Sequence, residues 1–84
     1  MNSFQQLGVA LADRRKALGL KQGAVALQAG VTQESLSRLE RGHLSEFGAR
    51  KLLAVLSVLG MEMQFTEASA GGLLDELRRE RGGA

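Results

Sequence analysis

Hydrophobic residues recur at intervals of three or four positions along most of the chain, a spacing that predicts a series of short amphipathic helices. The first predicted helix covers residues 3–18, and Ser3 followed by Gln6 forms a capping box at its start. Gly19 follows this helix, and glycine is the residue that most readily takes the left-handed conformation that ends a helix. The predicted apolar stripe of this helix consists of Phe4, Leu7, Ala10, Leu11, Ala17 and Leu18.

Three more helices are predicted, over residues 22–29, 33–41 and 46–59, and each of them is again followed by a glycine. Thr32 and Ser45 stand just before the second and third of these helices, where both residue types are favoured as N-caps. The residues expected to face inward are Val25, Ala26, Ala29, Val31, Leu36, Leu39, Ala49, Leu52, Leu53, Leu56 and Leu59.

The segment "GMEMQFTE", residues 60–67, has a different period from the rest of the chain. Met61, Met63 and Phe65 alternate with polar residues, which predicts a β-strand with one buried face. A strand needs a partner for its backbone donors and acceptors, and no other segment alternates in this way. A two-fold axis would let the same strand of a second chain lie antiparallel to it. We therefore predict a homodimer with these three apolar residues at its interface.

The end of the chain has the composition of a linker followed by a short helix. The polar, glycine-containing segment "EASAGG" precedes "LLDELRRER", which predicts a possible amphipathic helix over residues 73–81. We therefore divide the chain into a domain of residues 1–67 and a flexible tail of residues 68–84.

Composition excludes several classes of function. With 84 residues the chain can form one small domain, and without cysteine it has neither a disulfide framework nor a thiol nucleophile. A single histidine rarely makes a metal site, and no glycine-rich phosphate loop follows a strand. We expect no enzymatic activity, cofactor, metal or small-molecule ligand. The longest apolar run is too short to cross a bilayer and the N-terminus does not resemble a signal peptide, so we expect a cytoplasmic, nucleoid-associated protein.

Charge is unevenly distributed along the chain. Residues 1–59 carry eight lysines and arginines against four acids, whereas residues 60–84 carry three against five. The net charge of the whole chain is +2. A basic body with an acidic tail favours a polyanionic partner for the body, although many domains without such a partner have a similar surplus.

The most informative stretch is residues 18–42, where two short helices are joined by a tight turn that contains glycine. The second helix presents Gln33, Glu34, Ser37 and Arg38 outward, while its leucines face the core. The major groove of DNA admits one helix, and outward residues of this kind can hydrogen-bond to base edges. A solvated helix face would carry the same residue types, so the preceding turn is what favours DNA.

These residues resemble the helix-turn-helix of the phage-repressor/Cro class, the XRE family. The fourth helix running directly into the alternating segment is further similar to HipB-type antitoxins, whose partner toxin is a HipA-type serine/threonine kinase. The resemblance implies a mainly α, lambda-repressor-like domain of four to five helices, with one C-terminal β-strand pairing across a homodimer. Gly23, Ala24 and Leu27 depart from the usual pattern. The resemblance rests on Leu20, Gln22, Val25, Ala26, Ala29, Gly30, Val31, residues 35–40 and Gly42.

The resemblance also implies roles for individual residues. Gln33, Glu34, Ser37 and Arg38 match the base-contacting positions of the family. The positions that match phosphate contacts, or lie where a flanking phosphate is in reach, are Lys21, Gln22, Thr32, Arg41 and His43, and for His43 an exposed loop residue is an equal alternative. Arg15 and Glu40 match an ion pair that joins the first helix to the third.

Three functions are compatible with this sequence. The first is a DNA-binding antitoxin that binds a palindromic operator as a dimer, represses its own operon and neutralises a HipA-type kinase toxin. The second is a stand-alone repressor of the same fold, and the third is a protein-interaction module that does not bind DNA.

Overall fold

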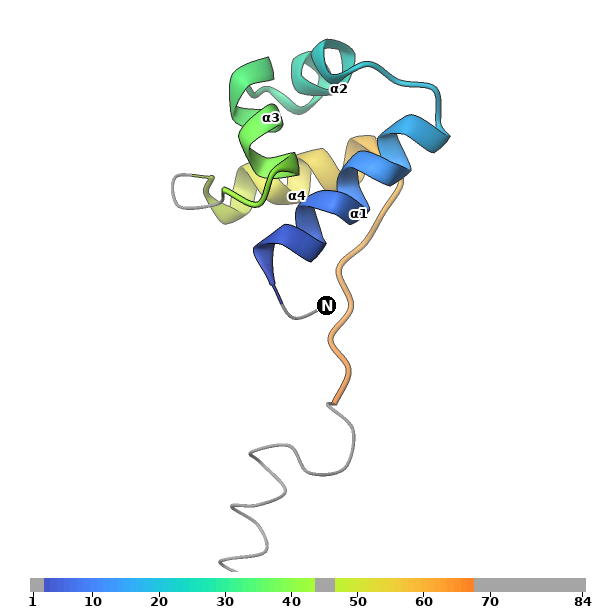
Figure 1. The fold of residues 1–84 in the computed structure, drawn as a ribbon, viewed down its shortest axis with the longest axis vertical. Coiled ribbons are helices and arrows are strands. Elements are labelled where there is room, and N and C mark those ends of the chain that lie inside the picture. The colour runs from blue at the N-terminus through green and yellow to red at the C-terminus, as the bar shows by residue number, and fades with distance from the viewer. Residues whose placement is uncertain (1–2, 44–46, 68–84) are drawn as a thin grey trace, which may run out of the picture.

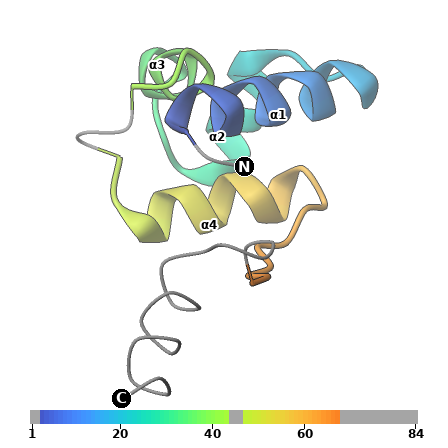
Figure 2. The ribbon, with the colours of Figure 1, turned by 60° about the horizontal axis from the view of Figure 1, so that its bottom comes forward.

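The computed structural model describes residues 3–43 and 47–67, and over these residues it contains four helices and no strand (Figure 1). The helices are α1 (Phe4–Ala17), α2 (Gln22–Ala29), α3 (Gln33–Glu40) and α4 (Ala49–Val58). Helix α3 packs against both α1 and α2, and α4 packs against α2. In Figure 2, α4 lies below the other three helices. The predicted mainly helical fold is confirmed, and no helix in the described ranges is long and apolar enough to cross a membrane.

The first three helices lie within one residue of their predicted ends, because local signals determine those ends. The Ser3 hydroxyl accepts a hydrogen bond from the Gln6 N–H at 3.1 Å, and the Thr32 hydroxyl accepts one from the Ser35 N–H at 3.0 Å. Both are N-caps of the expected kind, each satisfying an amide that has no partner inside its helix.

Each of the four helices is closed by a glycine in the left-handed conformation, at positions 19, 30, 42 and 60. The residue after the glycine then donates its N–H to the carbonyl five positions back: Leu20 to Arg15, for example, at 3.0 Å. These are Schellman motifs, in which the residue after the glycine often makes an apolar contact. Three of those residues, Leu20, Val31 and Met61, pack against the core. The glycines therefore both end the helices and direct the chain back inward.

The start of α4 differs from the prediction. The helix begins at Ala49 with Gly48 as its N-cap, whereas the predicted cap, Ser45, lies outside the described residues. Phe47 explains the difference, since its side chain is buried with a relative exposure of 7%. The chain enters the core at this phenylalanine before the helix begins, a tertiary contact that the helical periodicity does not reveal.

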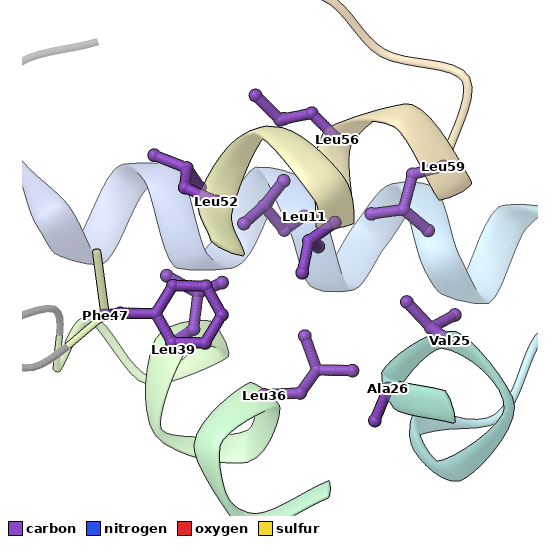
Figure 3. Packing of buried hydrophobic residues seen from close by; sticks show 10 residues of the cluster. Leu11, Val25, Ala26, Leu36, Leu39, Phe47, Leu52, Leu56 and Leu59 are labelled. Carbon is purple, nitrogen blue, oxygen red and sulfur yellow. The ribbon is translucent and has the colours of Figure 1, made fainter. Parts of the chain in front are cut away.

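The core lies where the four helices meet, and Figure 3 shows side chains of α2, α3 and α4 converging around Leu11 of α1. The predicted inward positions of α2 and α3 are buried or partly buried. The buried hydrophobic residues are Leu11, Val25, Ala26, Leu36, Leu39, Phe47, Leu52, Val55, Leu56 and Leu59.

The buried faces of α1 and α4 differ from the predicted ones, and Val55 of α4, which was not predicted to face inward, is 0% exposed. Phe4 and Leu18 are 63% and 43% exposed, because Gly8 and Arg15, together with the predicted Leu11, form the buried side of α1. Glycine and arginine are not apolar, so the spacing of apolar residues did not indicate that these two positions face inward. Three other residues that were predicted to face inward are also exposed: Ala17, Ala49 and Leu53.

Residues 61–67 form no strand in this single chain. Met61 packs partly against the core, whereas Met63 and Phe65 are 44% and 89% exposed. A strand that pairs across a two-fold axis needs a second copy, so the predicted pairing stays a prediction. The predicted helix over residues 73–81, and the tail of residues 68–84 to which it belongs, lie outside the described residues.

Candidate nucleic-acid interface

Helices α2 and α3 form a compact unit joined by three residues. Gly30 turns the chain with φ 73°, Val31 packs against the core, and Thr32 caps α3. The back of α3 is held by Leu36 and Leu39, both 0% exposed. A helix anchored in this way presents its remaining residues in one fixed direction. Figure 1 shows α2 and α3 at the end of the molecule opposite to residues 61–67.

The four predicted base-contacting residues share the outer side of α3. Gln33, Glu34 and Arg38 are exposed and Ser37 is half-buried. Arg38 and Glu34 are not independent, because Arg38 Nη2 donates to Glu34 Oε1 at 2.6 Å along one face of the helix. All four side chains are of types that can hydrogen-bond to base edges.

Four of the five predicted phosphate-contacting residues lie at helix ends on or beside this unit. Lys21 is the exposed N-cap residue of α2, and its side chain makes no capping hydrogen bond. The Thr32 hydroxyl is occupied with Ser35, both accepting from its N–H and donating to its hydroxyl. Arg41 and His43 are exposed just beyond α3. Helix N-termini and flanking cations of this kind are suited to phosphate groups.

The Gln22 side chain makes a contact that the prediction did not include. Its Nε2 donates to Glu40 Oε1 at 2.9 Å in a partly buried position, so its side-chain amide serves the interior of the domain. The reason is tertiary, since the carboxylate that recruits Gln22 lies 18 positions later in the chain. The phosphate contact of Gln22 stays a prediction.

Arg15 and Glu40 form the partly buried centre of this domain. Arg15 Nε donates to Glu40 Oε2 at 2.7 Å and Nη2 donates to Oε1 at 3.0 Å, with side-chain exposures of 11% and 6%. Arg15 Nη1 also donates to the Leu20 carbonyl at 2.9 Å. Together with Gln22, the first residue of α2, the network links α1, the segment between α1 and α2, the start of α2 and the C-terminal end of α3. Fork-to-fork pairs of this kind combine strength with a defined orientation.

The hydrogen bond to Glu40 raises the pKa of Arg15 above its usual value, against the opposing effect of burial. A raised pKa means that the folded state binds this proton more tightly than the unfolded state. The resulting stabilisation is complete below the usual arginine pKa and is lost only as the pH rises above it. Arg15 therefore makes no contribution to a pH dependence near neutrality.

Gly8, which the sequence analysis did not single out, allows α1 and α3 to approach each other at backbone distance. A Cβ at this position would lie 2.5 Å from the Glu40 carbonyl oxygen and 2.6 Å from that of Leu39. Gly8 precedes Arg15 by two helical turns, so both residues face α3. A glycine in the middle of a predicted helix is the available sequence signal, because glycine there is otherwise unfavourable.

Arg14 is a second residue that the sequence analysis did not single out. Its Nε donates to the Leu59 carbonyl at 2.9 Å, which satisfies a carbonyl at the C-terminal end of α4. This contact ties α1 to the point from which residues 61–67 leave the domain.

Comparison with known families agrees with this geometry. Residues 4–66 match the model of a family described as a helix-turn-helix domain, a range that includes all four helices and well over half of the chain. A comparison with curated proteins finds no significant match. The matched range contains the α2–turn–α3 unit and the polar outer side of α3. On this evidence the chain belongs to that family of DNA-binding helix-turn-helix domains.

Proposed function

We propose that this protein is a DNA-binding antitoxin, a binding protein and not an enzyme, which acts in the cytoplasm on the nucleoid. As a homodimer it binds a palindromic operator, represses its own operon and neutralises a HipA-type serine/threonine kinase. The observation that supports DNA binding is the outward polar side of α3, held by two fully buried leucines and by the Arg15–Glu40 pair. The dimer and the toxin rest on sequence: the alternating segment and the resemblance to HipB-type antitoxins.

In this proposal α3 enters the major groove and its N-terminal residues face the base edges. Phosphates flanking the groove are met by Lys21, Thr32 and Arg41, so affinity falls with rising salt because phosphate contacts release counterions. Two-fold symmetry of the dimer places the two half-sites a whole number of helical turns apart.

Replacement of Arg38 tests the base-contacting surface. Arg38→Ala is expected to cost roughly 1–3 kcal/mol of binding free energy and to relax sequence preference at one base pair, because the bidentate contact to guanine is lost. The measurement compares binding to a duplex that the wild-type protein selects from a random-sequence pool. Unchanged affinity and unchanged preference would mean that α3 does not read DNA.

Replacement of Met63 tests the dimer. Met63→Glu is expected to weaken dimerisation and operator binding together by about tenfold or more, because each dimer would bury two unpaired carboxylates. Met63 is 44% exposed in the single chain, so the fold of the subunit is preserved. Sedimentation equilibrium measures the first effect, with Thr66→Glu as a control that adds the same charge on the polar side. A Met63→Glu variant that stays dimeric would show that this segment is not the interface.

The alternative is a stand-alone repressor of the same fold. The two forms share every DNA contact and differ only in the partner. Co-purification with the product of the adjacent gene separates them: a stable complex with a kinase supports the antitoxin, and its absence favours the repressor.

A further inference from the structure

The exposed face of α3 carries one acidic and one basic side chain, and the two form an ion pair. Glu34 and Arg38 are 73% and 55% exposed at the side chain, and Arg38 Nη2 donates to Glu34 Oε1 at 2.6 Å. A guanidinium has five N–H donors, so a pair that uses one of them leaves others for a second acceptor. Arg38 can therefore remain bound to Glu34 while it also contacts a base.

The pair also defines where the guanidinium lies. Glu34 belongs to the first turn of α3 and Arg38 to its last turn, and residues four apart are neighbours on a helix surface. The contact therefore draws the Arg38 guanidinium toward the N-terminal end of α3. In the proposed complex this end faces the base edges, whereas the sugar-phosphate backbones of the two DNA strands lie to either side.

The charge balance of the two helices makes Glu34 distinctive. Across α2 and α3 the acids are Glu34 and Glu40, and Glu40 is turned inward to Arg15. Glu34 is thus the acid that would face DNA from this unit. The attraction for phosphates comes from elsewhere, including the exposed Lys21 and Arg41.

We propose that Glu34 is a positioning residue that sets sequence discrimination, by holding Arg38 for a guanine and withholding it from phosphates. This inference rests on the proposed DNA-binding function. On a cognate site, guanine O6 and N7 accept from Arg38 while the pair to Glu34 stays intact. On other sequences Arg38 finds no bidentate partner, and it can reach a phosphate only by leaving Glu34.

Glu34→Gln keeps the size of the side chain and removes the charge that retains Arg38. Arg38 is then free to move to a phosphate on any duplex, which strengthens non-cognate binding. We expect affinity for a shuffled duplex to rise about tenfold, with the cognate affinity changed by less than about threefold. The dependence of log affinity on log salt for the shuffled duplex steepens by about one, the signature of one added phosphate contact.

The experiment uses the full chain and two duplexes of equal length and composition. The first is selected by the wild-type protein from a random-sequence pool and the second is its shuffled counterpart; binding is measured by fluorescence anisotropy over a series of salt concentrations. Asp13→Asn is the matched control, since it removes the same charge from an exposed residue of α1, outside the α2–α3 unit. Circular dichroism confirms that each variant is folded.

A double-mutant cycle identifies the route through Arg38. In an Arg38→Ala background, Glu34→Gln is expected to leave both the ratio of the two affinities and the salt slope unchanged. The inference is overturned if Glu34→Gln strengthens both duplexes equally, since Glu34 would then act only as a negative charge near phosphates. It is also overturned if the ratio does not change. If the wild-type protein selects no sequence at all, the proposed function fails and this inference fails with it.

Discussion

Glu40→Ala is expected to lower the free energy of unfolding by about 3–5 kcal/mol, the usual cost of removing one partner from a buried ion pair. The variant would leave the Arg15 guanidinium buried without a counter-charge, and Gln22 would lose its acceptor. Native domains are stable by only about 5–15 kcal/mol, and small ones lie near the lower limit. We therefore expect a large fall in the melting temperature and a parallel loss of DNA affinity.

Urea denaturation followed by circular dichroism measures this effect. Glu34→Ala is the matched control, because it breaks the other ion pair of α3, which is exposed. Exposed pairs four residues apart on a helix contribute only about 0.3–0.5 kcal/mol, so the control should unfold almost as the wild type does. Equal losses in the two variants would show that the Arg15–Glu40 pair does not stabilise the domain.

Gly8→Ala is expected to destabilise the domain by about 3 kcal/mol, the upper part of the usual range for over-packed interiors. The new methyl group would meet the carbonyl oxygens of Glu40 and Leu39 at 2.5 and 2.6 Å, and these backbone atoms cannot move aside as a flexible side chain could. Helices α1 and α3 must then separate, which also strains the Arg15–Glu40 pair. This loss exceeds the roughly 1 kcal/mol that alanine gains over glycine in helix propensity.

Thermal denaturation compares this variant with Gly23→Ala, in which the same change is made in α2. A Cβ at Gly23 would meet only the Gln33 side chain, at 3.4 Å, so the propensity gain is unopposed by backbone. We expect Gly23→Ala to be neutral or stabilising by up to about 1 kcal/mol. A Gly8→Ala variant as stable as Gly23→Ala would contradict the close approach of α1 and α3.

The helix ends were predictable because their causes are local. The Ser3 and Thr32 caps act over three residues, and each terminal glycine acts within one turn. The same holds for the outward polar side of α3, since Leu36 and Leu39 determine which side of this short helix faces the core. These features are explained by interactions between residues that lie within about ten positions of one another in the sequence.

The features that the sequence analysis did not predict depend on contacts between distant segments. The Gln22–Glu40 hydrogen bond was not predicted because the two residues lie 18 positions apart. The Arg14 hydrogen bond to the Leu59 carbonyl was not predicted because the two residues lie 45 positions apart. The start of α4 was misplaced because Phe47 is drawn into the core before the helix begins.

By itself the sequence determined the helical class, the positions of the turns and the polar side of α3, since hydrophobic period, caps and left-handed glycines act locally. The tertiary structure decided what completes the buried face of α1 around the predicted Leu11 and the predicted Arg15–Glu40 pair. That face is formed by Gly8, Leu11 and Arg15. Gly8 has no side chain that would keep α3 away, and Arg15 pairs with a carboxylate of α3. Neither glycine nor arginine is apolar, so only the neighbouring helix explains why both lie inside.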